Sequence, residues 1–371
     1  MAIIGGGQAG LALAIQIARQ GYRVILFEKE QYPFHKVCGE YISLESWDFL
    51  KQLGIDLEQM NLPIIRRLQV SASNGTLLEQ DLPLGGFGIS RFLIDDTLAR
   101  IAQESGVMIV VNTKVNELVF TGDSFIIHTS GQQYSAKLVC GCYGKRSNID
   151  IKWKRSFTTA AKNRLNNYIG VKYHIQTEFP ADTIALHNFK HGYCGIVAIE
   201  DNKYNLCYLT DARNLQQNGN SIAQMEQNVL MQNPHLKKIF ATSSFLFDAP
   251  LTISQISFEK KTQVDHHVLM LGDAAGMITP LCGNGMSMAL HASKLAAKQV
   301  HLFLQGKISR LQMETNYTLD WQMQFSKRLR TGRVIQSVLG QDWLAGSFVS
   351  VCKKFPKLLS LMIRHTHGKP F

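Results

Sequence analysis

The chain has 371 residues, too many for one simple core, so we expect two domains or one domain with a large insertion. The 45% hydrophobic content is that of a globular protein. The sequence has no run of about eighteen apolar residues, so no membrane span is predicted. The seven scattered cysteines argue against a disulfide framework and favour a reducing cytoplasm. The net charge of +11 comes without a nucleic-acid reading motif, so we do not expect nucleic acid as a partner.

The first 28 residues have the pattern of a strand, a glycine-rich turn, a helix and a second strand. In the turn, Gly5 allows the tight bend, Gly7 lets the backbone approach a pyrophosphate, and Gly10 lets helix and strand pack closely. The helix N-terminus offers unpaired N–H groups to phosphates. Glu28 ends the second strand, where a carboxylate can accept hydrogen bonds from a ribose diol. The segment predicts a dinucleotide site.

Residues 66–89 alternate as a strand and end in a glycine-rich turn, and a helix follows from Ser90. Further strands are predicted at 107–111, 114–120, 124–129 and 138–142. Residues 156–257 are mostly strand-like, with one helix near 220–232.

A strand at 268–271 leads into Gly272-Asp273-Ala274-Ala275-Gly276, and a long helix is predicted from about 286 to 304. This aspartate turn, placed far beyond the first glycine turn, indicates that the nucleotide is FAD. We therefore expect a discontinuous FAD-binding domain, a β-sheet substrate domain and a basic helical C-terminal region. Their ranges are 1–65, 90–155 and 258–320 for the first, 66–89 and 156–257 for the second, and 321–371 for the third.

The C-terminal region carries most of the excess positive charge. Residues 321–371 contain nine Lys or Arg and one Asp, a net charge of +8, with apolar residues between them. One interpretation is a solvated helical face over a packed one. The other is a docking surface for an anionic membrane surface, a diphosphate substrate or an acidic carrier protein. His365 and His367 are not expected to bind a metal.

With these motifs the chain resembles FAD-dependent oxidoreductases related to aromatic hydroxylases (group A flavin monooxygenases) and geranylgeranyl reductases. The resemblance is strongest in residues 1–45, 90–98 and 268–290. It implies an α/β fold: a Rossmann-like FAD-binding domain of the glutathione-reductase type, an inserted antiparallel β-sheet substrate domain and a helical C-terminal region.

The resemblance also implies roles for individual residues. Arg91 would reach the phosphate and ribityl region, the backbone of Val115 would face the adenine, and Asp273 would bind a ribityl hydroxyl. The helix that follows Met286 would point its positive end at the flavin, where reduced flavin carries negative charge. The expected cofactor-binding residues are Gly5, Gly7, Ala9, Gly10, Glu28, Lys29, Cys38, Gly39, Arg91, Val115, Gly272, Asp273, Pro280, Gly283, Asn284, Gly285 and Met286.

Cys38-Gly39-Glu40 separates the two branches of this superfamily, because it resembles geranylgeranyl reductases more than simple aromatic hydroxylases. Cys38 is the tentative catalytic residue, placed near flavin and substrate; the alternative is a small packed residue in a loop. Glu40 is expected to organise the loop or to contact FAD. His35 and Lys36 are expected at the surface.

The chain departs from the hydroxylase pattern at Tyr143-Gly144, where those enzymes often carry Asp-Gly. The usual docking of a nicotinamide is therefore in doubt, and NADH or NADPH would act as a transient reductant. The Trp-x-Trp-x-Ile-Pro signature of tryptophan halogenases is also absent from the sequence.

Three functions follow from the resemblance. The first is an NAD(P)H-driven monooxygenase that hydroxylates a hydrophobic or aromatic small molecule in secondary metabolism. The second is a reductase of C=C bonds in a prenyl, polyene or carrier-bound chain. The third is a protein that binds FAD without turnover. We expect a cytoplasmic protein, with peripheral membrane contact as the alternative.

Overall fold

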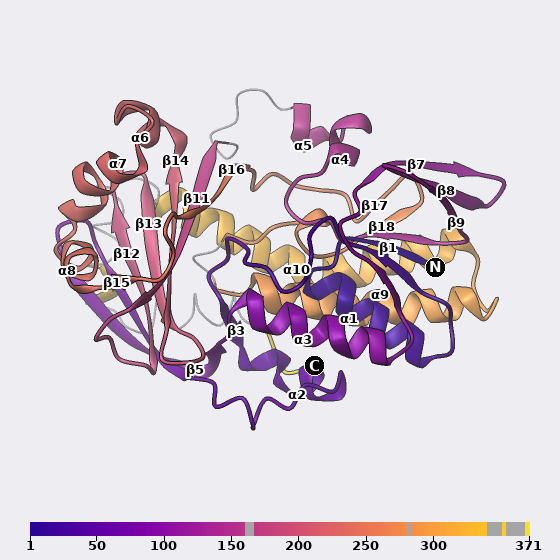
Figure 1. Cartoon of the computed structure of the whole chain (residues 1–371), viewed down its shortest axis with the longest axis horizontal. Coiled ribbons are helices and arrows are strands. Elements are labelled where there is room, and N and C mark those ends of the chain that lie inside the picture. The colour runs from indigo at the N-terminus through magenta and orange to yellow at the C-terminus, as the bar shows by residue number, and fades with distance from the viewer. Residues whose placement is uncertain (160–166, 280–282, 340–350, 354–367) are drawn as a thin grey trace.

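The computed structural model describes residues 1–159, 167–279, 283–339, 351–353 and 368–371, which form two sheet-based halves side by side (Figure 1). The first half is built on a six-stranded sheet with the strand order β17-β18-β10-β1-β2-β6. Its strands are β1 (Ala2–Ile4), β2 (Ile25–Phe27), β6 (Met108–Val110), β10 (Val139–Gly141), β17 (Val264–Asp265) and β18 (Val268–Met270). All neighbours are parallel except β17 and β18.

Four helices pack beside this sheet (Figure 1). Helix α1 packs against α3 and α9, and α10 packs against α9. The four helices are α1 (Gln8–Arg19), α3 (Arg91–Glu104), α9 (Gly285–Leu304) and α10 (Arg310–Leu339). A small sheet of β7 (Val115–Thr121), β8 (Ser124–Thr129) and β9 (Gln133–Ala136) lies on the other side of the six strands, and Tyr134 of β9 contacts Phe27 (Figure 1).

The second half is a nine-stranded sheet with the path β15-β11-β14-β13-β12-β4-β5-β3, in which β16 also pairs with β11. Its strands are β3 (Tyr41–Ser43), β4 (Ile64–Ser71), β5 (Leu77–Gly88), β11 (Tyr168–Gln176), β12 (Thr183–Phe189), β13 (Gly192–Ala198), β14 (Tyr204–Asp211), β15 (Ser244–Phe245) and β16 (Leu251–Ile256). Pairing is antiparallel except between β4 and β12.

This sheet buries both faces, because successive side chains of a strand point to opposite sides. On the outer face, residues such as Tyr208 pack under α6 (Ala212–Gln217), α7 (Ile222–Asn228), η2 (Leu230–Gln232) and α8 (Pro234–Thr242). The inner face carries a second apolar cluster, which includes Met277 from just beyond β18. We call this cluster the inner apolar face: Val70, Ala72, Leu78, Leu186, Tyr193, Leu209, Ile256, Phe258, Met277 and Cys352.

The remaining short elements are η1 (Leu44–Ser46), α2 (Trp47–Gln52), α4 (Asn148–Lys152), α5 (Ser156–Thr159) and η3 (Gly272–Ala274). Among the described residues, no helix combines the length and the apolar character that a membrane-crossing segment needs.

The α/β architecture expected from the sequence is confirmed, and most predicted strands and helices match within a few residues. The single helix predicted near 220–232 is wrong, since that region holds α7, η2 and α8. Asn233 separates η2 from α8 in an extended conformation and caps α8, whose first residue is Pro234. Strand β3 falls within the range 1–65 but pairs with β5 of the nine-stranded sheet.

The first glycine turn leaves no room for a side chain at Gly10, which gives a stability test. A Cβ there would lie 2.2 Å from the carbonyl oxygen of Gly5, so Gly10→Ala should lower the free energy of unfolding by about 1–3 kcal/mol. Gly131→Ala is the matched control, because no atom lies within 4 Å of the added Cβ, and its change should stay below about 0.5 kcal/mol. Urea denaturation measures both, and equal midpoints for the two variants would contradict this packing.

Candidate functional site

The glycine turn between β1 and α1 is held in one conformation. Gly5 has φ +105°, and a Cβ on it would lie 2.4 Å from the Cys142 carbonyl oxygen. The buried Glu28 accepts hydrogen bonds from the amides of Gly6 and Lys29, both at 2.8 Å. In this part of the chain, no side chain caps α1 at Gly7. The N-terminal amides of α1 therefore suit an anion.

Two cations lie beside this turn. A Cβ placed on Gly7 would be 3.4 Å from Nη2 of Arg91 and 3.9 Å from Nζ of Lys36. Both cations pair with the buried Asp95, at 2.6 Å from Arg91 and 3.0 Å from Lys36. Burial raises the pKa of Asp95, but the two positive charges outweigh it and hold that pKa below its usual value. The ionised carboxylate orients both cations at the edge of the turn and leaves one positive charge uncompensated.

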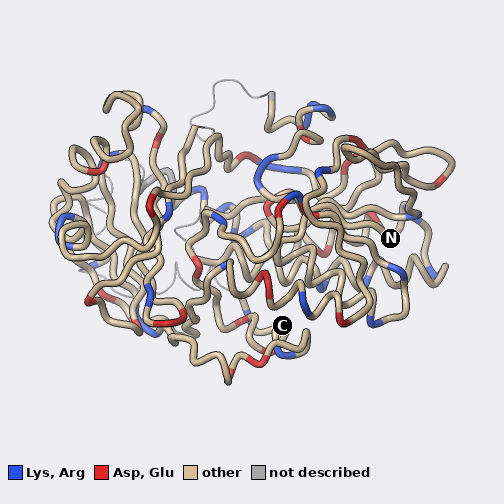
Figure 2. Tube along the Cα trace, viewed as in Figure 1, with Lys and Arg blue, Asp and Glu red and all other residues tan. Residues whose placement is uncertain are grey.

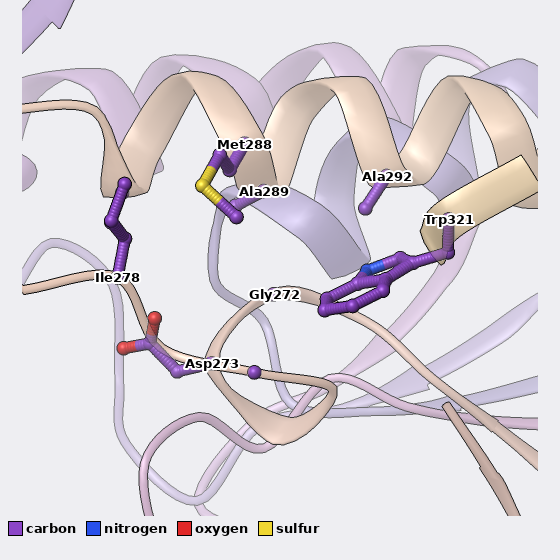
Figure 3. A pocket seen from close by; sticks show the side chains of 9 residues that line it. Gly272, Asp273, Ile278, Met288, Ala289, Ala292 and Trp321 are labelled. Carbon is purple, nitrogen blue, oxygen red and sulfur yellow. The ribbon is translucent and has the colours of Figure 1, made fainter. Parts of the chain in front are cut away.

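The aspartate turn lies beside the glycine turn in space. A Cβ placed on Gly272 would lie 3.4 Å from the Cβ of Ala9, and Nε2 of Gln8 lies 3.4 Å from Sδ of Met286. A small pocket lies between η3, α9 and α10 and is lined by Gly272, Asp273, Gly276, Ile278, Gly285, Met288, Ala289, Ala292 and Trp321. In Figure 3, Met288, Ala289 and Ala292 of α9 lie across this pocket from Asp273. The pocket includes neither the glycine turn nor Cys38.

A buried lysine ties the aspartate turn to the segment that joins β10 to α4, where Figure 2 shows basic residues. Nζ of Lys261 donates to the carbonyl oxygens of Asp273 and Lys145, both at 2.8 Å. Burial lowers the pKa of Lys261 to about 8, against the opposing effect of Asp273. The hydroxyl of Tyr143 donates to Asp150 at 3.1 Å, so this residue, which replaces the hydroxylase aspartate, is bonded to a carboxylate in the interior.

Cys38 lies in the loop before β3, between the glycine turn and the nine-stranded sheet. Its side chain is part-exposed and interacts with the Arg91 guanidinium. Its carbonyl oxygen accepts a hydrogen bond from Asn205 of β14 at 3.2 Å. Of the cysteines in the described part of the chain, Cys38 and Cys207 are part-exposed and the others are buried. The loop therefore brings a thiol to the boundary of the two halves.

The other expected site residues lie near the two turns, at the surface or outside the described residues. Val115 begins β7 close to Glu28, because the amide of Thr113 donates to the Glu28 carbonyl oxygen at 2.9 Å. Gly283 has φ +62°, Asn284 is the N-cap residue of α9, and Gly285 is its first residue.

Lys29 and Gly39 are exposed, and the Lys29 side chain pairs with Glu30 at 3.3 Å. Pro280 lies outside the described residues. Within the described ranges, no three His, Cys, Asp or Glu side chains gather as a metal site would require.

His35 and Lys36, which were expected at the surface, are only part-exposed. The ring of His35 stacks on Phe92 at 4.6 Å and contacts Phe247 at 4.9 Å, and burial lowers its pKa to about 4. Lys36 pairs with Asp95. The ion pair between Arg91 and Asp95 could have been predicted from the sequence, because the two residues are four apart on one helix. Lys172, His174 and Lys261 carried no local signal, because their partners are distant in sequence.

Several known proteins are similar in sequence to this chain over most of its length. A digeranylgeranylglycerophospholipid reductase of Methanosarcina acetivorans is 24% identical over 335 residues, which are 86% of this chain and 79% of that protein. Conditioned medium factor receptor 1 of Dictyostelium discoideum is 24% identical over 326 residues, and the match spans 80% of this chain but 62% of the receptor.

Solved structures share the fold. A flavin-dependent brominase matches with a TM-score of 0.78 at 18% identity, covering 98% of this chain and 92% of that one. A geranylgeranyl bacteriochlorophyll reductase-like protein from Thermoplasma acidophilum matches with a TM-score of 0.77 at 17% identity, covering 98% and 95%. The sequence profile described as "FAD binding domain" matches residues 1–318. The chain therefore belongs to this family of FAD-dependent oxidoreductases, as the resemblance in its motifs predicted.

Proposed function

We propose that this FAD-dependent oxidoreductase is an NAD(P)H-driven monooxygenase that hydroxylates a hydrophobic small molecule. The observation that carries the proposal is the inner apolar face, which extends from the nine-stranded sheet to Met277 beside the aspartate turn. A buried apolar surface next to the cofactor site would bind an apolar substrate and exclude water from the reaction.

The residues present fit FAD. The open amides at the start of α1, with Arg91 and Lys36 close to Gly7, would hold the pyrophosphate. Glu28 would exchange its amide partners for ribose hydroxyls, and Asp273 would accept from a ribityl hydroxyl. When bound, FAD would supply the redox chemistry, taking a hydride from the nicotinamide and passing electrons to oxygen.

A second candidate is the reduction of a C=C bond in a prenyl, polyene or carrier-bound chain. The part-exposed Cys38 beside Arg91 favours it, because a thiol there could donate the proton that completes the reduction. The similarity to a digeranylgeranylglycerophospholipid reductase supports the same substrate class.

The basic C-terminal region supports a further part of the proposal, an anionic carrier protein or surface that presents the substrate. On α10, Lys327 and Arg330 are exposed on the same side as Leu319 and Met323. This combination of charge and apolar side chains suits an acidic amphipathic partner.

Labelled oxygen distinguishes the two reactions. With a hydrophobic substrate, NADPH or NADH and ¹⁸O₂, mass spectrometry should find one labelled oxygen atom in the product. If the product instead gains two hydrogen atoms, and still forms when the reaction is run anaerobically, the protein is the reductase. If the rate of flavin reduction is the same with and without substrate, and no product forms, FAD binding without turnover would be supported.

Substitution of Arg91 tests the cofactor site. Arg91→Met removes a cation next to the turn and should raise the Kd for FAD about tenfold or more, measured by quenching of flavin fluorescence. Lys29→Met is the matched control: its side chain is exposed, and the Kd should change by less than about twofold. Equal Kd values for the two variants would remove Arg91 from the site.

Cys38→Ser separates the two candidate reactions by rate. If the thiol donates the proton, kcat should fall about 100-fold while Cys207→Ser, at the other part-exposed cysteine, keeps its rate. In a monooxygenase both variants should retain kcat, since no proton from the thiol enters the product.

A further inference from the structure

The carboxylate of Glu40 joins three segments that are distant in sequence. Its Oε1 accepts hydrogen bonds from the amide of Arg91 at 2.7 Å and from Nζ of Lys172 at 2.5 Å. Its Oε2 lies 2.7 Å from Nε2 of His174. Glu40 belongs to the Cys38 loop, Arg91 begins α3, and Lys172 and His174 belong to β11. We call Glu40, Lys172 and His174 the Glu40 cluster.

The Glu40 cluster is buried, so its charges need one another. Glu40 and Lys172 have no exposed side-chain surface, and His174 has 5%. Burial raises the pKa of Glu40, but Lys172 and His174 outweigh it and hold that pKa below its ordinary value. Glu40 is therefore an ionised acceptor, and removal of one partner would leave an uncompensated buried charge on the other.

The rest of the loop is also held by side chains from outside it. Nζ of Lys172 donates to the carbonyl oxygen of Lys36 at 3.2 Å, and Lys145 donates to that of Val37 at 3.3 Å. Asn205 donates to that of Cys38 at 3.2 Å. Glu40 itself has φ +54°, a left-handed conformation that needs support from its surroundings. Three successive carbonyl groups and one carboxylate thus set the path of the loop.

We propose that Glu40 is a positioning residue that, through Lys172 and His174, fastens the Cys38 loop and the first turn of α3 to strand β11. Glu40 donates no proton and touches no substrate in this role. It sets the distance between the Arg91 guanidinium at the glycine turn and the Cys38 thiol at the nine-stranded sheet. The two halves of the site are thereby assembled as one unit.

The test uses Glu40→Gln, Lys172→Met and the double variant in the full chain. Two properties are measured: the Kd for FAD, and the rate of Cys38 alkylation by iodoacetamide, followed by peptide mass spectrometry. Each single variant should change both properties about tenfold or more, because each leaves one buried charge unpaired. The double variant should change them less than the product of the two single effects, since both charges are gone.

Glu200→Gln is the matched control. Glu200 also accepts a hydrogen bond from the start of α3, through the amide of Ser90 at 2.8 Å. Glu200→Gln should leave the Kd for FAD and the alkylation rate of Cys38 within about twofold of the parent, because this carboxylate is not part of the Glu40 cluster. If Glu40→Gln behaves like Glu200→Gln, or if the single effects simply multiply in the double variant, the proposal is wrong.

A milder variant keeps the test decisive if a single charge substitution prevents folding. Asn205→Ala frees only the Cys38 carbonyl group and leaves the Glu40 cluster intact. Because the cluster is intact, the alkylation rate of Cys38 and the Kd for FAD should both stay within about twofold of the parent. A rise of about tenfold in the alkylation rate would show that the loop is not fastened by the Glu40 cluster and would overturn the proposal. No measurement here depends on turnover, so the outcome is independent of whether the reaction is hydroxylation or reduction.

Discussion

The close approach of the glycine turn to the aspartate turn is the constraint on which the rest of the site depends. Gly10 admits the carbonyl oxygen of Gly5, and Gly272 lies against Ala9, so α1 starts directly beside η3. A side chain at Gly10 would push α1 away from the turn after β1, and one at Gly272 would be strained by the backbone φ of +58°. Because this contact is made of backbone and small side chains, it leaves helix N-terminal amides open for the cofactor phosphates.

Around this contact, buried charges are arranged in compensating groups. Asp95 orients Arg91 and Lys36, Glu40 pairs with Lys172, and Lys261 bonds to two carbonyl oxygens. Each group joins segments far apart in the chain, and each would be costly to break because its partner would remain buried. Electrostatics thus links the FAD-binding half to the sheet that faces it.

The two halves of the molecule differ in what they reveal about function. The FAD-binding half accounts for cofactor and reaction class, which the family shares among monooxygenases, halogenases and geranylgeranyl reductases. The nine-stranded sheet has an inner face that is apolar at Leu186 and Leu209 and charged at Lys172. Function belongs to the site rather than to the fold, so one family fold can host several reactions.

The sequence by itself determined the α/β fold and the FAD turns, because these depend on local patterns: glycine spacing, strand alternation and helix periodicity. It also indicated which strands bring Glu28 and Asp273 to the site. Only the tertiary structure decided that Lys29 is exposed, that His35 lies between aromatic rings, and that Lys172 and His174 meet Glu40. These outcomes depend on the tertiary structure. The spacing of residues within one segment does not show which side chains from distant segments will form a buried ion pair.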